Sequence, residues 1–168
     1  IDPYGIAKYA VEMDIITAHK QFDLMYNIVR PHNVLGIYQN IWDKYRNVIG
    51  IFIKKALNGE PILIYGDGEQ TRAFSDKYFT INEVANIVQD IAMNKHQLHV
   101  EIEYKEPRHE VKHAYSDHKK AKELLKFEDK TDLYKLIDSM FTWAKEQPDR
   151  ETKLMNYEVT EGIYEYWK

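Results

Sequence analysis

An α/β fold is predicted from three features of the sequence. Residues 5–22 and 48–57 place apolar side chains three and four residues apart, which is the period of an amphipathic helix. Residues 25–29 and 62–65 are short apolar runs, long enough for buried strands and too short for helices. At 168 residues, of which 44% are hydrophobic, the chain can bury a core of one domain. Because helix and strand patterns alternate, an α/β architecture is favoured.

Proline and glycine mark the ends of these elements. Pro3 suits the approach to the first helix, and Pro31 ends the strand-like run that follows it. Asn58 and Gly59 stop the second helix, and Pro61 precedes the next strand. Further along, the patterns predict a turn at 66–68, a helix from the Thr80–Glu83 capping box to about Met93, a strand at 99–104, a short helix capped by Ser116 or Asp117 and ending at Leu125, and a final helix from Leu133 to Ala144.

The composition argues against several classes of function. Lys and Arg total 23 against 27 Asp and Glu, and no long basic run marks a nucleic-acid-binding surface. No apolar run approaches the roughly 20 residues of a membrane helix. With no cysteine, disulfides and thiolate metal sites are ruled out, and a cytoplasmic protein is expected. The carboxylates of Asp67, Glu69 and Asp76 form no metal-ligand pattern, so no metal is expected.

One pair of residues at the start of the first helix suits proton transfer. Tyr4 and Lys8 stand four residues apart, so their side chains share one face of the helix. A tyrosine hydroxyl, with a pKa near roughly 10, is a poor base at neutral pH, but a fixed ammonium group beside it favours the phenolate. Such a pair can move a proton to or from a substrate hydroxyl. The same spacing also occurs on ordinary helix surfaces, so the surrounding residues decide between the two interpretations.

Those surroundings resemble a known family. Residues 3–8, which read Pro-Tyr-Gly-Ile-Ala-Lys, and residues 30–34 resemble the extended short-chain dehydrogenase/reductase family. Residues 46–49 and 64–72 look like the branch of UDP-glucose 4-epimerase and the sugar-nucleotide dehydratases. Residues 106–111 resemble the second arginine segment of that branch. The four motifs and this segment follow the family's order, and the resemblance covers nearly the whole chain up to the last helix.

The resemblance implies a division of the chain. Residues 1–45 are similar to the end of an NAD-binding Rossmann domain, the latter part of a doubly wound parallel sheet. Residues 46–148 resemble a small α/β domain that binds the sugar nucleotide, and 149–168 form a tail. Two departures stand out: the chain starts at the Tyr-Lys motif without the glycine-rich NAD loop, as if cut from something longer, and relatives carry a helix and a strand after Asp76. We expect that the second segment was omitted from the sequence rather than deleted from the protein.

The resemblance also implies roles at the cofactor. Tyr4 is similar to the family's catalytic acid/base, and Lys8 to the residue that lowers the pKa of that tyrosine and binds the nicotinamide ribose of NAD. Pro31 and His32 would lie beside the nicotinamide. His32 also suits a base, although a histidine in a tight loop is more often a packing or hydrogen-bonding residue.

Five further residues are implied to bind the substrate. Asn33 would face the diphosphate-sugar portion, and Asn47 starts a helix, where free N–H groups favour an anion. Arg72 and Arg108 would grip the diphosphate through fork-shaped hydrogen bonds, with surface salt bridges as the alternative. Tyr65 would pack near the base, or simply end a strand.

The function implied is NAD-dependent epimerisation of a nucleoside-diphosphate sugar, with hydride transfer at the sugar C4 and a tyrosine as acid/base. A 4,6-dehydratase is the alternative within the family. A non-catalytic sugar-nucleotide-binding module is the alternative outside it, supported by the absent glycine-rich loop. The resemblance further implies a homodimer through the helix that carries Tyr4, whose apolar residues would equally serve an intramolecular core.

Overall fold

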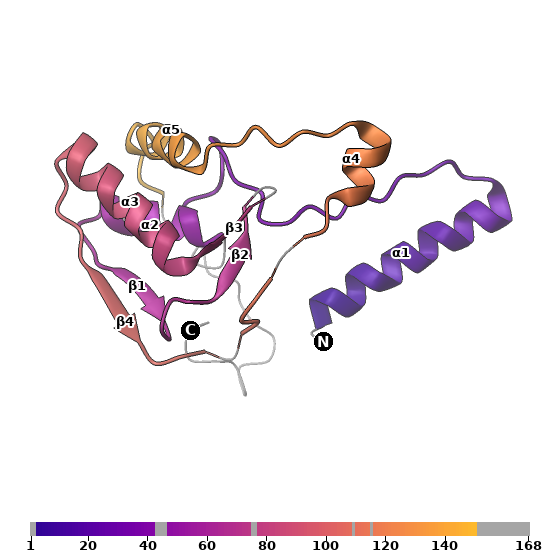
Figure 1. Cartoon of the computed structure of the whole chain (residues 1–168), viewed down its shortest axis with the longest axis horizontal. Coiled ribbons are helices and arrows are strands. Elements are labelled where there is room, and N and C mark those ends of the chain that lie inside the picture. Colours follow the sequence, from indigo (N-terminus) through magenta and orange to yellow (C-terminus); the bar gives the residue numbers. More distant parts are fainter. Residues whose placement is uncertain (1–2, 43–46, 75–76, 109, 115, 151–168) are drawn as a thin grey trace. The chain divides into compact units, whose positions relative to one another are not determined.

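The computed structural model describes residues 3–42, 47–74, 77–108, 110–114 and 116–150. The chain divides into two compact units, residues 1–31 and residues 32–168, and each is described by itself. Figure 1 shows the first as a long helix with an extended segment and the second as a layered body. Of the predicted tail, only residues 149 and 150 lie among the described residues.

The first unit is built on α1, which runs from Pro3 to Phe22, close to the predicted helix, and buries none of its residues. The strand predicted at 25–29 is wrong: this segment is extended but forms no strand, and Met25 and Val29 are 87% and 80% exposed. A strand requires hydrogen bonds to a neighbour, and no strand of the described part of the chain pairs with this segment. An apolar run is therefore not enough to predict a strand.

The second unit confirms the α/β class. Strand β1, Ile62–Tyr65, pairs in parallel with β4, Ile102–Lys105, and Tyr65 lies opposite Lys105. Helix α2 and strand β1 have the predicted bounds. The elements of this unit, in order, are α2 (Val48–Leu57), β1, β2 (Thr71–Ala73), β3 (Tyr78–Thr80), α3 (Ile81–His96), β4, α4 (Lys119–Leu125) and α5 (Leu133–Lys145).

Three helices and strand β1 enclose the core of this unit. Helices α2 and α3 pack against each other and against β1, while α5 packs against both helices (Figure 1). Burial follows the predicted periods: alternate residues of β1 are buried, and buried residues of each helix recur at spacings of three and four. The largest fully buried side chains are Phe141, Ile49, Ile53, Ile62, Ile64, Ile91, Ile137, Met140, Val84 and Val88.

Local hydrogen bonds set the ends of the helices. At α3 the predicted capping box is present, with Thr80 Oγ1 accepting from Glu83 N and Glu83 accepting from Thr80 N. This helix extends to His96, three residues beyond the prediction, and ends because Gln97 adopts a left-handed conformation. At α4 the predicted cap, Ser116 or Asp117, is wrong: the N-cap is His118, whose side chain makes no capping hydrogen bond, and Asp117 accepts from Lys119 N at 2.8 Å from one residue earlier.

Strands β2 and β3 form an antiparallel hairpin that the sequence did not predict. Thr71 lies opposite Thr80, and Phe74 N donates to Lys77 O at 3.1 Å. The family resemblance indicates that relatives carry a helix and a strand between these segments, which we expect to have been omitted from this sequence. The predicted break itself, after Asp76, adjoins residues 75–76, which lie outside the described residues.

The turn after β1 depends on Gly68 and Asn82. Gly68 has a φ of +75°, which a residue with a Cβ rarely adopts. Its carbonyl accepts from Asn82 N, and Asn82 Nδ2 donates to Asp67 O at 3.0 Å and to Glu69 at 2.6 Å. A Cβ placed on Gly68 would lie 1.9 Å from Asn82 Oδ1, so any other residue there requires the Asn82 side chain to move out of these hydrogen bonds.

Gly68→Ala should therefore destabilise the protein more than Gly59→Ala. Gly59 has a similar φ of +71° but open space around its Cα, so its substitution reports the backbone strain alone. We expect a loss of about 1 kcal/mol for Gly59→Ala and about 3 kcal/mol for Gly68→Ala in the free energy of unfolding. Urea denaturation of both variants measures the difference. Equal losses would contradict the packing of Gly68 against Asn82.

A histidine at the end of α3 packs against α5. The ring of His96 stacks on Phe141, with centroids 4.6 Å apart and an angle of 20° between the planes. Its Nε2 atom is buried and has no hydrogen-bond partner in the described part of the chain. Burial lowers the pKa of His96 below 6.5; Lys145 and Lys95 lower it further, while Asp138 opposes them. The neutral ring is thus favoured in the folded protein.

This lowered pKa predicts a loss of stability in mild acid. Below about pH 6.5 the unfolded chain binds a proton at His96 that the folded protein resists, so the free energy of unfolding falls as the pH drops towards the folded pKa. In His96→Gln this part of the fall is absent. Urea unfolding at pH 7, 6 and 5 compares the two proteins. The same fall in both would show that His96 does not titrate with unfolding.

Candidate sugar-nucleotide site

The residues predicted at the cofactor fall at the two ends of the first unit and at the start of the second. Tyr4 and Lys8 lie on the exposed surface of α1, and Lys8 Nζ is 5.3 Å from the centroid of the Tyr4 ring. The predicted sharing of one helix face is confirmed. Pro31 ends the first unit and His32 begins the second, and both are exposed.

The two predicted asparagines are held by hydrogen bonds inside the second unit. Asn33 Nδ2 donates to Ala73 O at 3.0 Å, which ties the loop after residue 32 to the end of β2. Asn47 is the N-cap of α2: its Oδ1 accepts from Ile49 N at 3.0 Å, and its Nδ2 donates to Val34 O at 3.3 Å. Asn47 thus orients the first turn of a helix whose N-terminal end favours an anion.

Arg108 lies on the ring of Tyr65. The guanidinium carbon is 3.1 Å from the ring centroid, a cation–π contact between the end of β1 and the segment after β4. Both side chains are half-buried. The structure therefore brings the predicted base-packing residue and one of the two predicted phosphate-binding arginines together.

The other arginine, Arg72, is held from three sides. Its Nη1 donates to Thr71 O at 2.9 Å and to Val111 O at 2.7 Å. Its Nη2 donates to a carboxylate oxygen of Glu110 at 2.8 Å. The side chain of Arg72 is 18% exposed, so this ion pair is partly shielded from water. The alternative interpretation, a salt bridge, is present, and it fixes the guanidinium rather than leaving it mobile.

Gln70 and Glu110 lie within the family-like segments 64–72 and 106–111, but the sequence predicted no role for them. Gln70, the buried polar residue of the described core, donates through Nε2 to Tyr65 O and to Glu110, both at 3.0 Å. Glu110 thereby joins Gln70 to Arg72. The spacing of residues in the sequence could not predict this link, because Glu110 lies 40 residues after Gln70 and 38 residues after Arg72. We call Tyr65, Gln70, Arg72, Arg108 and Glu110 the arginine cluster.

Backbone hydrogen bonds hold the two halves of the arginine cluster in register. Gly66 N donates to Lys105 O at 2.9 Å, next to the paired ends of β1 and β4. Further on, Thr71 N donates to Lys112 O at 2.8 Å and Ala114 N to Thr71 O at 3.1 Å. The cluster is therefore built on a fixed backbone and carries two guanidinium groups, one carboxylate and an aromatic ring. This chemistry suits a ligand with a planar base and a phosphate.

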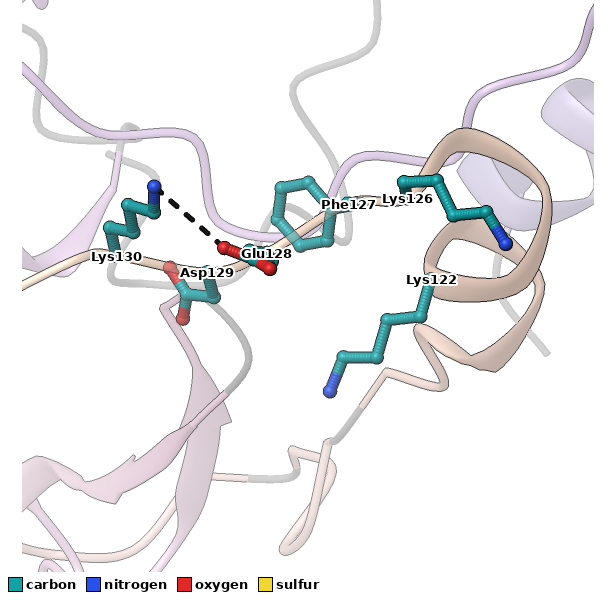
Figure 2. Close-up of a pocket in the computed structure, with 6 residues that line it drawn as sticks. All are labelled: Lys122, Lys126, Phe127, Glu128, Asp129 and Lys130. Carbon is teal, nitrogen blue, oxygen red and sulfur yellow. Dashed lines mark ion pairs between the residues drawn. The ribbon is translucent and has the colours of Figure 1, made fainter.

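A hollow of about 570 Å³ among the described residues is lined by none of the predicted site residues (Figure 2). It is lined by Lys122, Lys126, Phe127, Glu128, Asp129 and Lys130. Figure 2 shows these side chains along the end of α4 and the segment after it, with Lys130 paired to Glu128 at 3.7 Å.

Two further kinds of feature are absent from the described residues. No cluster of three or more metal-ligating side chains was found among them. Nor does any described helix have the length and apolarity needed to cross a membrane.

Comparison with known proteins shows which family the first part of the chain is similar to. Residues 1–78 match the model of the NAD dependent epimerase/dehydratase family. The first 78 residues are thus similar to that family, in agreement with the resemblance that the motifs indicated.

Individual relatives are similar over most of this chain. A protein of Methanocaldococcus jannaschii that carries the name UDP-glucose 4-epimerase is 31% identical over 172 residues, 86% of this chain and 54% of its own length. The UDP-N-acetyl-alpha-D-glucosaminuronate decarboxylase of Bacillus cytotoxicus is 27% identical, over 85% of this chain and 53% of its own. The crystal structure of the Thermotoga maritima UDP-glucose 4-epimerase with UDP-glucose has a TM-score of 0.76 at 28% identity, over 86% of this chain and 53% of that one. This chain thus spans about half the length of these relatives.

Proposed function

We propose that the natural gene product is an NAD-dependent nucleoside-diphosphate-sugar 4-epimerase, with a UDP-sugar as substrate. The observation that carries this proposal is the arginine cluster, in which Arg108 lies on the Tyr65 ring and Arg72 pairs with Glu110, on two segments joined by backbone hydrogen bonds. The M. jannaschii and T. maritima proteins support a UDP-sugar, since both bear the name UDP-glucose 4-epimerase. Within the cytoplasm, where we expect it, the protein would act as a homodimer.

The second unit would bind the substrate. Arg72 and Arg108 would pair with the diphosphate, because a guanidinium matches phosphate oxygens through paired N–H groups. Tyr65 would pack against the base, with Arg108 moving from the ring towards the phosphates. The N-terminal end of α2, which Asn47 caps, carries a partial positive charge that would favour the diphosphate. Asn33 would face the sugar side.

The first unit would carry the proton transfer. The hydroxyl of Tyr4 and the ammonium of Lys8 share one exposed face, a pair of donors that suits the hydroxyls of a ribose, so the residues present fit NAD. When bound, NAD supplies acceptance and return of a hydride at the sugar C4. Tyr4 would take the proton of the C4 hydroxyl and later return it, while Lys8 stabilises the phenolate. Pro31 and His32 would border the same site.

The two alternative functions differ from the proposed epimerase in the product that they form. A 4,6-dehydratase would use the same bound nucleotide. A non-catalytic module would bind the UDP-sugar without turning it over. Incubation with UDP-glucose and NAD separates them, because an epimerase yields UDP-galactose, a dehydratase yields a 4-keto-6-deoxy sugar, and a binding module yields neither.

Tyr4→Phe should abolish most of the epimerase activity. The variant removes the proton-transferring hydroxyl and keeps the ring, so we expect kcat to fall by about a thousandfold with little change in KM. The matched control is Tyr9→Phe, which removes a hydroxyl from another exposed tyrosine of α1. Conversion of UDP-glucose to UDP-galactose measures both. Normal turnover by Tyr4→Phe, or an equal loss in Tyr9→Phe, would contradict the assigned role.

A further inference from the structure

Glu110 connects two parts of the arginine cluster. One of its carboxylate oxygens accepts from Gln70 Nε2 at 3.0 Å, and the other accepts from Arg72 Nη2 at 2.8 Å. Gln70 donates in turn to Tyr65 O at 3.0 Å. A chain of hydrogen bonds therefore runs from the backbone of Tyr65, through a buried amide and a carboxylate, to the guanidinium of Arg72.

We propose that Glu110 is a positioning residue that orients Arg72 for the diphosphate of the sugar nucleotide. The inference rests on the proposed function. Glu110 itself would not contact the ligand. Its action passes through Arg72, whose other terminal nitrogen is held by Thr71 O and Val111 O. With both terminal nitrogens anchored, the plane of the guanidinium is fixed before the ligand arrives.

The chemistry of the two neighbours explains why a carboxylate is required. Gln70 Nε2 and Arg72 Nη2 are both donors, and an ionised carboxylate offers an acceptor oxygen to each. A glutamine at position 110 has one acceptor oxygen and one NH₂ group, so one neighbour would face a donor. Glu110→Gln therefore keeps the size of the side chain and breaks one of the two links.

A long, flexible arginine gains affinity from being held in its binding orientation. An arginine that must be ordered by the ligand loses rotamer freedom on binding, which weakens the complex. Anchoring by Glu110 removes that loss in advance. The side chain of Glu110 is 39% exposed and that of Arg72 is 18% exposed, so the ion pair lies at the edge of the unit, where a ligand can reach the guanidinium.

Glu110→Gln in the natural gene product should weaken binding of UDP by about tenfold, the usual effect of one lost charged hydrogen bond. Titration calorimetry with UDP measures the Kd, and turnover of UDP-glucose should show KM rising as much with kcat changed less than about twofold. Glu103→Gln is the matched control, since Glu103 pairs with Lys105 at 2.7 Å and is 43% exposed. It should leave the Kd unchanged.

Glu110→Asp keeps both acceptor oxygens on a shorter side chain, so it should bind UDP more tightly than Glu110→Gln and less tightly than the unchanged protein. This variant allows the inference to be tested even if Glu110→Gln does not fold.

A double-mutant cycle separates positioning from direct contact. Arg72→Ala should weaken UDP binding by about a hundredfold, and Glu110→Gln added to it should cause less than about a twofold further loss. A further tenfold loss would mean that Glu110 acts on the ligand itself, which overturns the inference. If Arg72→Ala loses binding but Glu110→Gln does not, the inference alone fails. If Arg72→Ala binds UDP as well as the unchanged protein, the proposed diphosphate site fails.

Discussion

The candidate site depends on the parallel pairing of β1 with β4. Because parallel strands end at the same edge, the segments that follow Tyr65 and Lys105 leave the sheet side by side. They then exchange backbone hydrogen bonds as far as Thr71 and Ala114. Every residue of the arginine cluster lies on one of these two segments or on the strand end that begins them. The sheet thus determines which side chains can meet, and the turn at Gly68 and Asn82 fixes one segment against α3.

Much of the second unit could be predicted because its signals are local. The bounds of α2 and β1 follow from periodicity and from flanking breakers, and the capping box of α3 from residues three apart. Where the signal was not local, prediction failed. Residues 25–29 are apolar but form no strand, since a strand needs a partner that a sequence window does not contain. The β2–β3 hairpin was not predicted, because its two three-residue strands are too short to show a period and the resemblance placed a gap between them.

The same distinction applies to the site. Tyr4 and Lys8 were placed together correctly because i, i+4 geometry is a property of any helix. Arg72 and Arg108 were proposed through resemblance, and the structure adds the contacts that hold them. Gln70 and Glu110 had no predicted role, because their value lies in a link between segments about 40 residues apart. Such a link follows from the register of β1 with β4 and cannot be deduced from spacing.

The most direct test of the proposed site is a crystal structure of the natural gene product with NAD and UDP. The proposal predicts diphosphate oxygens within hydrogen-bonding distance of Arg72 and Arg108, the base against Tyr65, and the Glu110 link to Arg72 intact. UDP bound elsewhere, for example in the hollow beside Lys122 and Lys126, with Arg108 still stacked on Tyr65, would contradict it.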